Sequence, residues 1–405
     1  MRVSLVGMGC GATGLTNVGA RALETADLVV GAARLLADLP PTCARRVVAS
    51  RPEDVATAIA ASTSTADHAV VLLSGDTGFH SAATLTAELL AAEGLDVEIV
   101  PGISSVQLLA ARLGRPWQDW RLLSAHGQTC DIVAELCHGA PVFLLTSGAG
   151  SVGEVCSELV VAGLGEATVT VGERLGYPDE RLTSGAACDM ARSGYGALNV
   201  LLVELPAELV PKRRAPGIPD DEFVRARVPM TKQEVRAVAL AKLAVTPDDV
   251  CWDVGAGTGA VSVELSLAAR STWAIERESD AVELIRQNRL RHRAWKLRVV
   301  KGEAPAALED LPVPDVVFVG GSGGRLADIL NAAVAANSCV RICVTAIALE
   351  TLELARCWMG EHGFAIEITQ LAVGRTRQSG SHHLLLANNP VFLVVGTRAD
   401  WEMRP

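Results

Sequence analysis

Short apolar runs alternate with Ala- and Leu-rich stretches over the first half of the chain. The runs with the length and the Val, Leu and Ile content of buried strands are 3–7, 69–75, 96–100, 141–146, 167–173 and 197–205. The stretches between them are long enough to form helices. This alternation predicts an α/β domain over residues 1–205.

The periodic pattern stops between residues 206 and 229. This segment holds five prolines, the basic run 212–214 and the acidic pair Asp220 and Asp221. Because proline removes amide donors and fixes the backbone, a segment this rich in proline and charge favours an extended connector over a packed element. The sequence therefore predicts a solvated linker here, in preference to a basic binding patch.

The alternation of apolar and amphipathic stretches resumes over residues 230–405. Thr231 and Glu234 have the T-x-x-E spacing of a capping box, which predicts a helix over 232–243. Strands are predicted at 250–254, 272–276, 297–301, 315–319 and 340–346. Helical stretches lie between them, so we expect a doubly wound, Rossmann-like sheet.

The last two predicted strands, 365–373 and 391–397, break this order because no long helix separates them. A polar loop is expected between them. We therefore expect an antiparallel hairpin at one edge of the sheet. No internal repeat relates the two halves, so the sequence predicts two unrelated α/β folds in one chain.

A glycine-rich turn, DVGAGTG at 253–259, follows the first strand of the second domain and leads into a helix. Such a turn lets the amides of a helix N-terminus approach a ligand closely. Its GxGxG spacing differs from the GxGxxG of dinucleotide sites, and an acidic residue ends the next strand, where it can accept hydrogen bonds from a ribose. This order favours S-adenosylmethionine over NAD or FAD. The predicted donor contacts are Asp253, Gly255, Ala256, Gly257, Thr258, Gly259 and Glu276.

Two further turns of the second domain follow later strands. GEAP at 302–305 lies where the adenine ring would bind, and it adds Glu303 and Ala304 to the donor contacts. FVGGSGG at 318–324 holds four glycines. Because glycine destabilises helices and strands, its use there favours close approach of a ligand over a merely flexible loop. The candidate substrate contacts in this turn are Gly320, Gly321 and Ser322.

The first domain carries glycine- and serine-rich turns of its own. VGMGCG at 6–11 is weak evidence alone, but LLSGDTGFHS at 72–81 and PGISSVQ at 101–107 also follow strands, and ligands of α/β folds bind at such strand ends. The other turns of this kind are SAHG at 124–127, LLTS at 144–147 and VGERLGYPDE at 171–180. His80 and His126 lie in two of these turns, where a histidine more often bonds backbone groups than acts as a general base.

Composition excludes several classes of protein. The net charge of −10 argues against broad nucleic-acid binding, which needs a basic face. No apolar run reaches the roughly 18 to 20 residues that cross a bilayer, and no signal-peptide pattern is present. The ten cysteines include no CxxC pair. We therefore expect a cytoplasmic protein with free thiols and with no metal site and no membrane partner.

Several motifs in the second half go beyond a generic donor turn. They are PMTKQEVRA at 229–237, AIERE at 274–278, GEAP, VFVGGSGG and QLAVGR at 370–375. Together with DVGAGTG they resemble the decarboxylating precorrin methyltransferases of cobalamin synthesis over nearly all of 225–400. The resemblance implies a class I methyltransferase fold with donor contacts at Thr231, 255–259, Glu276 and Ala304.

The turns of the first half together resemble the tetrapyrrole methylases, a second donor-binding fold with two α/β subdomains and a cleft between them. The resemblance runs from residue 1 to about 205. The GxGPG of that family stands here at 7–11 and its GDP at 75–77, and both prolines are absent. The implied donor contacts are Gly9, Cys10, Ser74, Gly75, Asp76, Phe79, Ser104, Ser105 and Thr146.

Together the two resemblances imply a bifunctional enzyme with one S-adenosylmethionine site in each domain. It would methylate precorrin-6B at C5 in the first domain and at C15 in the second. The second domain would also remove the carboxylate of the ring C acetate, which gives precorrin-8. The sequence identifies no catalytic groups, and the resemblance implies a homo-oligomer.

The remaining carboxylates of such a substrate need cationic anchors. The candidate cluster is Arg375, Arg377, His382 and His383, with a solvated polar hairpin as the alternative. Two other functional interpretations stay open. One keeps the donor but changes the acceptor, for instance to RNA. The other makes the first domain a docking scaffold, because its motif prolines are missing, and leaves only the second domain catalytic.

Overall fold

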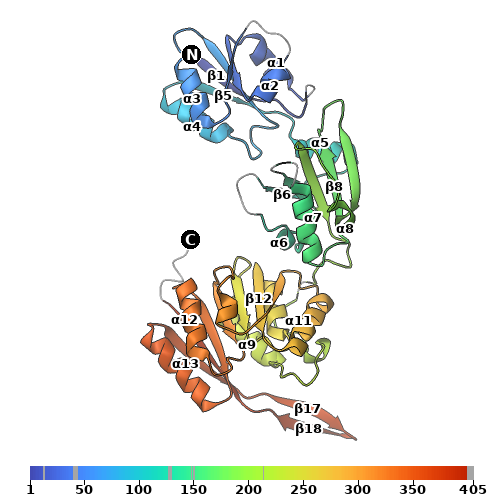
Figure 1. Ribbon diagram of the computed structural model, residues 1–405, viewed down its shortest axis with the longest axis vertical. Coiled ribbons are helices and arrows are strands. Elements are labelled where there is room, and N and C mark those ends of the chain that lie inside the picture. The colour runs from blue at the N-terminus through green and yellow to red at the C-terminus, as the bar shows by residue number, and fades with distance from the viewer. Residues whose placement is uncertain are drawn as a thin grey trace. The chain divides into compact units, whose positions relative to one another are not determined.

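The computed structural model describes residues 1–11, 14–39, 44–125, 130–146, 148, 151–212 and 214–398. The chain divides into two compact units, Met1–Pro206 and Ala207–Pro405 (Figure 1). The described part of the first unit holds two five-stranded sheets, and that of the second holds a seven-stranded and a two-stranded sheet. Both units are mixed α/β structures, which confirms the predicted fold class.

The first sheet of the first unit is parallel throughout and has the order β3-β2-β4-β1-β5. Its strands are β1 (Arg2–Gly7), β2 (Leu28–Gly31), β3 (Arg45–Val48), β4 (His68–Leu73) and β5 (Asp96–Val100). Its helices are α1 (Asn17–Glu24), α2 (Ala33–Ala37), α3 (Pro52–Ala60) and α4 (Ala83–Ala92). On β1, Val3 and Leu5 pack into one core cluster and Val6 into the other. Burial on both faces explains why most residues of this strand are apolar, with only Ser4 as a buried polar residue.

The second sheet of the first unit has the order β6-β7-β10-β8-β9, and only the β6–β7 pair is parallel. Its strands are β6 (Arg121–Ser124), β7 (Val142–Leu145), β8 (Thr168–Glu173), β9 (Arg181–Ala186) and β10 (Asn199–Glu204). The helices are α5 (Ser105–Leu113), α6 (Ile132–Leu136), α7 (Ser151–Val161) and α8 (Ala187–Met190). The apolar pattern missed β2, β3, β6 and β9. Three of these, β3, β6 and β9, are edge strands with partly exposed residues, whereas β2 is a buried strand of only four residues.

The large sheet of the second unit has the order β13-β12-β11-β14-β15-β19-β16. Its strands are β11 (Val250–Val254), β12 (Ser271–Glu276), β13 (Leu297–Lys301), β14 (Val316–Val319), β15 (Arg341–Ala346), β16 (Ala365–Leu371) and β19 (Val391–Thr397). The helices are α9 (Gln233–Lys242), α10 (Ala260–Ala268), α11 (Ser279–Arg291), α12 (Leu326–Ala336) and α13 (Leu349–Glu361), with short 3-10 helices η1 (Asp220–Glu222) and η2 (Ala306–Leu308). The doubly wound sheet and the antiparallel pairing of β16 with β19 at its edge are confirmed.

The faces of β11 show how this sheet is covered. Trp252 and Val254 pack toward residues of α12 and α13 such as Leu330 and Met359. Cys251 faces the opposite way and packs with residues of α9 and α10. The two faces of the central strand are thus both buried, and the carboxyl ends of the parallel strands are left for the site.

The segment predicted as a polar loop before β19 forms a separate hairpin, β17 (Gly374–Ser379) paired with β18 (His382–Ala387). We call this hairpin the arm. Figure 1 shows it extending away from the large sheet of its unit. Leu384, Leu385 and Leu386 are exposed on it. The loop prediction was wrong because β17 contains no apolar residue to mark it as a strand.

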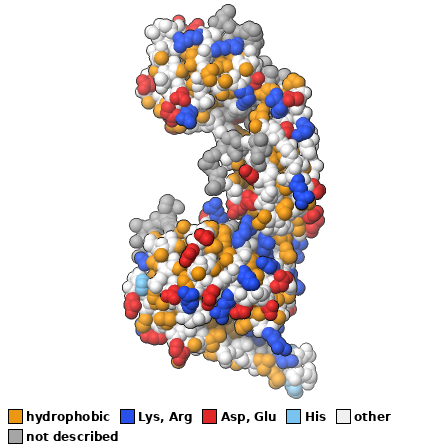
Figure 2. All heavy atoms as spheres, viewed as in Figure 1, with side chains coloured by type: hydrophobic (Ala, Val, Ile, Leu, Met, Phe, Trp, Pro, Cys, Tyr) orange, Lys and Arg blue, Asp and Glu red, His pale blue; other side chains and the backbone are white. Residues whose placement is uncertain are grey.

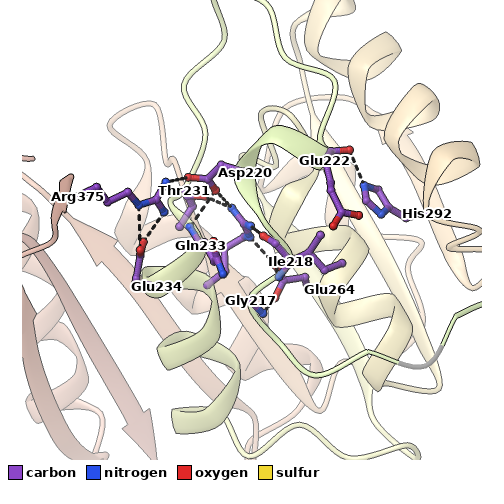
Figure 3. Close-up of polar contacts among 11 residues, drawn as sticks. Gly217, Ile218, Asp220, Glu222, Thr231, Gln233, Glu234, Glu264, His292 and Arg375 are labelled. Carbon is purple, nitrogen blue, oxygen red and sulfur yellow. Dashed lines mark hydrogen bonds and ion pairs between the residues drawn. The ribbon is translucent and has the colours of Figure 1, made fainter. Parts of the chain in front are cut away.

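Much of the segment expected to be a solvated linker packs on the second unit instead. Ile218 and Phe223 are buried in a core cluster of that unit. The amides of Gly217 and Ile218 donate to the buried Glu264 carboxylate at 2.7 and 3.0 Å (Figure 3). The backbone of this segment is therefore bound by a charged helix residue, which a hydrophobic pattern does not reveal.

The predicted capping box at Thr231 does not form. The N-cap of α9 is Lys232, one residue later, and its side chain makes no capping bond. The Gln233 amide donates to the Asp220 carboxylate at 3.0 Å, and Glu234 forms an ion pair with Arg375 (Figure 3). The prediction was wrong because Asp220, from the preceding segment, binds the amide at the start of the helix, and because Glu234 is paired with Arg375 and not with the N-cap.

Candidate active sites

A cavity of about 930 Å³ opens in the second unit at the carboxyl ends of β11, β12, β14 and β15. The predicted donor residues that line it are Thr231, Asp253, Gly255, Ala256, Gly257, Thr258, Glu276, Glu303 and Ala304. Gly259 is not among the lining residues. It is the left-handed N-cap of α10, with a φ of 76°, and it packs on Ile285.

The two glycine-rich turns of this unit lie directly against each other. Gly255 has a φ of 70°, and a Cβ built on it would stand 2.3 Å from the carbonyl oxygen of Gly321. No side chain fits at such a distance. Part of the glycine content that the sequence assigned to ligand approach therefore serves contact between the turns.

The Glu276 carboxylate is fixed by backbone amides. It accepts from Gly257 at 2.9 Å through one oxygen, and from Arg277 and Glu278 at 2.8 and 3.0 Å through the other. The residue is buried and lines the cavity. Each carboxylate oxygen can accept more than one bond, so the group retains capacity for hydroxyls of a ligand.

The Asp253 carboxylate is fully buried beside it. Ser262 donates to Oδ2, whereas Oδ1 has no hydrogen-bond partner among the described residues. Burial raises the pKa of Asp253 to about 7, and the nearby charge of Glu276 adds to this effect. A buried acceptor without a partner is rare in folded proteins and indicates a ligand donor.

The other side of the cavity is lined by residues that the sequence did not single out, together with Gly320, Gly321 and Ser322 of the predicted turn. They include Val344, Thr345, Ile347, Ala348, Thr351, Asn388, Asn389 and Val391. Ile347, Ala348 and Thr351 follow β15, the fifth parallel strand, and this position could have marked them as site residues. Nothing in the sequence indicates the asparagines that follow the arm.

The predicted cationic cluster does not lie among the cavity-lining residues. Arg375 pairs with Glu234 and Asp220, with a 2.7 Å contact to the latter. Arg377 is exposed on the arm, and His382 and His383 lie at the start of β18. The basic residues that the structure brings to the cavity are instead Arg227, Lys232 and Arg277.

The first unit has a cavity of about 420 Å³. Every predicted donor contact of this unit lines it: Gly9, Cys10, Ser74, Gly75, Asp76, Phe79, Ser104, Ser105 and Thr146. His80 lines it too, whereas His126 lies outside the described residues. Sequence reasoning missed Arg34, which no motif marks, and it did not single out Tyr177 within its turn.

The turns around this cavity are held by Asp76. Its carboxylate accepts from the amides of Gly78 at 2.8 Å and Gly102 at 3.1 Å. Gly9 and Gly75 exchange backbone hydrogen bonds at 3.0 and 3.1 Å, so the first two turns are joined without the motif prolines. Burial raises the pKa of the Cys10 thiol to about 11, and this side chain is therefore neutral at physiological pH.

The described residues hold no cluster of three or more His, Cys, Asp or Glu that could bind a metal. No helix in the described ranges is long and apolar enough to cross a membrane. On the face shown in Figure 2, described Lys and Arg side chains are interspersed with Asp and Glu over both units.

Glycine-rich turns at the ends of parallel strands, with a fixed carboxylate on the neighbouring strand, define the second unit as a methyltransferase-type α/β fold. Residues 222–398 match the family described as "Precorrin methyltransferase domain", and residues 2–191 match "Tetrapyrrole (Corrin/Porphyrin) Methylases". The chain belongs to the precorrin methyltransferase family, whose methyl donor is S-adenosylmethionine.

Two relatives and one solved structure illustrate the similarity. A precorrin-6Y C(5,15)-methyltransferase [decarboxylating] of Sinorhizobium is 36% identical over 274 residues, which are 66% of this chain and 65% of that protein. A probable cobalt-precorrin-6B C(15)-methyltransferase (decarboxylating) of Pyrobaculum calidifontis is 40% identical over 184 residues, 44% of this chain and 94% of that one. A crystal structure of precorrin-6Y C5,15-methyltransferase from Geobacter metallireducens is 37% identical, with a TM-score of 0.44, and covers 46% of this chain and 98% of its own.

Proposed function

We propose that this chain is a bifunctional, decarboxylating precorrin-6Y C5,15-methyltransferase of cobalamin synthesis. It transfers methyl groups from S-adenosylmethionine to C5 and C15 of precorrin-6B and removes the ring C acetate carboxylate, giving precorrin-8. The observation that carries the proposal is the presence of two separate cavities. Each lies in a unit that matches its own methyltransferase family.

We assign C15 methylation and decarboxylation to the second unit and C5 methylation to the first. The precorrin methyltransferase match falls in the second unit. Relatives about half as long as this chain carry only the C15 and decarboxylating activities in their names. The C5 reaction is then left for the tetrapyrrole methylase unit.

One S-adenosylmethionine binds in each cavity under this proposal. In the second unit, the free Oδ1 of Asp253 accepts from the donor's ammonium and Glu276 accepts from its ribose hydroxyls. Glu303 and Ala304 flank the adenine. In the first unit the donor contacts are the nine predicted residues around Gly9 and Asp76 that line the cavity.

The sulfonium methyl is already activated, so each unit has to align it with a nucleophilic meso carbon and exclude water. Loss of carbon dioxide is favoured when the carboxylate is poorly solvated and its electron pair enters the conjugated macrocycle. The apolar side chains of Val344, Ile347 and Val391 supply such surroundings in the second cavity. Gly320, Gly321 and Ser322 bound the space for the acceptor.

The other substrate carboxylates need cations, and we assign this role to Arg227 and Lys232. Both line the cavity, and neither has an ion-pair partner among the described residues. Arg375 is the weaker candidate because two carboxylates already bind it. Arg377 lies on the arm, away from the lining residues.

We also propose that the protein is a cytoplasmic homo-oligomer that uses neither membrane nor nucleic acid as a partner. The three exposed leucines of the arm support association, because apolar side chains gathered on a projecting hairpin gain stability when covered. The buried free thiols Cys251 and Cys343 are typical of a reducing compartment.

The test is mass spectrometry of the tetrapyrrole product after anaerobic incubation of the full chain with metal-free precorrin-6B and excess S-adenosylmethionine. Two added methyl groups and one lost carbon dioxide are expected. One methyl with decarboxylation would leave the first unit as a scaffold and contradict its catalytic role. No change with this acceptor or with its cobalt-bearing form would contradict the proposal and favour another acceptor.

A further inference from the structure

The first-unit cavity contains one strongly basic side chain among its described lining residues, Arg34. Arg34 is the second residue of α2, immediately after β2. The acidic lining residue Asp76 is bound by two backbone amides. The guanidinium therefore provides the positive charge of this cavity.

The charge of Arg34 is held in place but not neutralised. Its Nη1 donates to the Tyr177 hydroxyl at 2.9 Å and its Nη2 to the Ser74 hydroxyl at 3.1 Å. No carboxylate forms an ion pair with it in the described part of the chain, whereas Arg112 and Arg115 of the same unit each pair with one. Two neutral partners fix the fork and leave further N–H groups for a ligand.

Tyr177 is itself positioned by a braced loop, 174–180. Glu180 accepts from the Gly176 amide at 2.7 Å and from Arg112 at 2.6 Å. A Cβ built on Gly176 would stand 2.1 Å from the carbonyl oxygen of Cys10, so the loop lies directly on the predicted donor turn. The conformation of this loop places the Tyr177 phenol at the cavity wall.

Asp38 completes the arrangement. The Tyr177 hydroxyl donates a hydrogen bond to Oδ2 of Asp38 at 2.8 Å. A lone pair of the phenol oxygen is then directed toward Arg34, whose Nη1 donates to it. Burial and this hydrogen bond raise the pKa of Tyr177, so the phenol stays protonated. The hydrogen bonds from Tyr177 to Asp38 and from Arg34 to Tyr177 therefore orient the guanidinium, and no carboxylate pairs with it directly.

We infer that Arg34 binds a carboxylate side chain of the tetrapyrrole acceptor in the first-unit cavity, with Tyr177 and Asp38 as positioning residues. The inference rests on the proposed function of that unit and identifies how it holds its substrate. A guanidinium fork matches a carboxylate and forms strong, charge-assisted hydrogen bonds. The other source of a carboxylate in this cavity is the methionine part of the donor.

The test compares the full chain with its Arg34→Ala, Arg34→Lys and Tyr177→Phe variants. The rate of C5 methylation is measured against acceptor and donor concentration separately. Arg34→Ala is expected to raise the acceptor KM of that step by about 10-fold or more, since a hydrogen bond to a charged group is lost. The acceptor KM of Arg34→Lys should lie between those of the wild type and Arg34→Ala, because lysine keeps the charge but not the fork of N–H groups. Tyr177→Phe should raise the acceptor KM by a smaller factor than Arg34→Ala.

The controls separate folding from binding. Arg21→Ala, an exposed arginine on α1 outside the cavity, should leave both KM values unchanged. Every variant should keep C15 methylation, decarboxylation and two binding sites for S-adenosylhomocysteine in calorimetry. These readouts show that the chain is folded and that the donor sites are intact.

Each outcome decides between the alternatives. An acceptor-specific increase in KM supports the inference. An equal increase for the donor, with weaker S-adenosylhomocysteine binding, would assign Arg34 to the donor's carboxylate and overturn it, as would no change in either value. A wild-type product with a single added methyl would instead overturn the proposed function of the first unit.

Discussion

Asp220→Ala is the substitution whose effect the structure specifies best. The Asp220 carboxylate is 8% exposed and accepts from Arg236 at 2.8 Å, Arg375 at 2.7 Å and the Gln233 amide at 3.0 Å (Figure 3). Removing it leaves one guanidinium nitrogen of the fully buried Arg236 without its carboxylate partner. Since the Glu264 ion pair remains, we expect a loss near the lower end of the range for breaking a buried pair, about 3 kcal/mol.

The assay is urea unfolding of the full chain, with hydrogen exchange of peptides from 217–242 to identify the unit that unfolds. Asp221→Ala is the matched control, because that neighbouring carboxylate is exposed, and it should change stability by less than about 0.5 kcal/mol. A loss below about 1 kcal/mol in Asp220→Ala would refute the view that this carboxylate holds the segment to α9 and the arm.

The same network predicts how this contribution depends on pH. Burial alone would raise the pKa of Asp220, but the hydrogen bonds from Arg236 and Arg375 outweigh it and lower the pKa below its usual value. A lowered folded-state pKa adds stability above the unfolded pKa of about 3.9, and this stability disappears as pH falls through the folded value. The difference between wild type and Asp220→Ala should therefore be constant near neutral pH and shrink below about pH 4.

Three further predictions concern the second-unit cavity. Asp253→Asn should weaken S-adenosylhomocysteine binding there by about 10-fold at pH 8. The wild-type affinity at this site should fall as pH drops below 7, because the Asp253 carboxylate then becomes protonated. Calorimetry across pH measures both effects, and a wild-type affinity that does not change with pH would contradict the ammonium contact. Gly255→Ala should destabilise the turn by about 1–3 kcal/mol in urea unfolding, since a Cβ meets the Gly321 backbone, whereas Gly321→Ala, whose Cβ meets nothing within 4 Å, should be well tolerated. Lys232→Ala should raise the acceptor KM for decarboxylation about 10-fold with the donor KM unchanged, and Arg377→Ala should change neither; the reverse pattern would restore the arm as the anchor.

The sequence predicted the second-unit sheet closely, because its central strands are mostly apolar and their helices have regular spacing. β11 and β13 have the predicted bounds, and β12 begins one residue earlier than expected. The segment before α9 could not be predicted in this way. Its order comes from Arg236, which is 0% exposed although a charged residue on a helix is normally expected at the surface.

The candidate sites divide in the same way. Glycine turns at strand ends identified most of the predicted donor residues that line the two cavities, because these residues lie close together in the sequence. Residues that act through charge and distant contacts gave no such signal. Arg34 has no motif around it, and Arg375 looks like a free anchor until the fold brings Asp220 and Glu234 to it, 155 and 141 positions away.

The contrast between these two arginines shows what decides whether a cation is available to a substrate. Both are held by neighbours from distant parts of their units, and neither is buried: Arg34 is exposed and Arg375 is half-buried. Arg375 is held by two carboxylates, so a substrate anion that binds it has to compete with Asp220 and Glu234 for the guanidinium. Arg34 is held by two hydroxyls, which fix its geometry and leave its charge for a ligand. The chemical type of the supporting group, more than exposure or proximity in sequence, therefore distinguishes a structural arginine from a binding one in this chain.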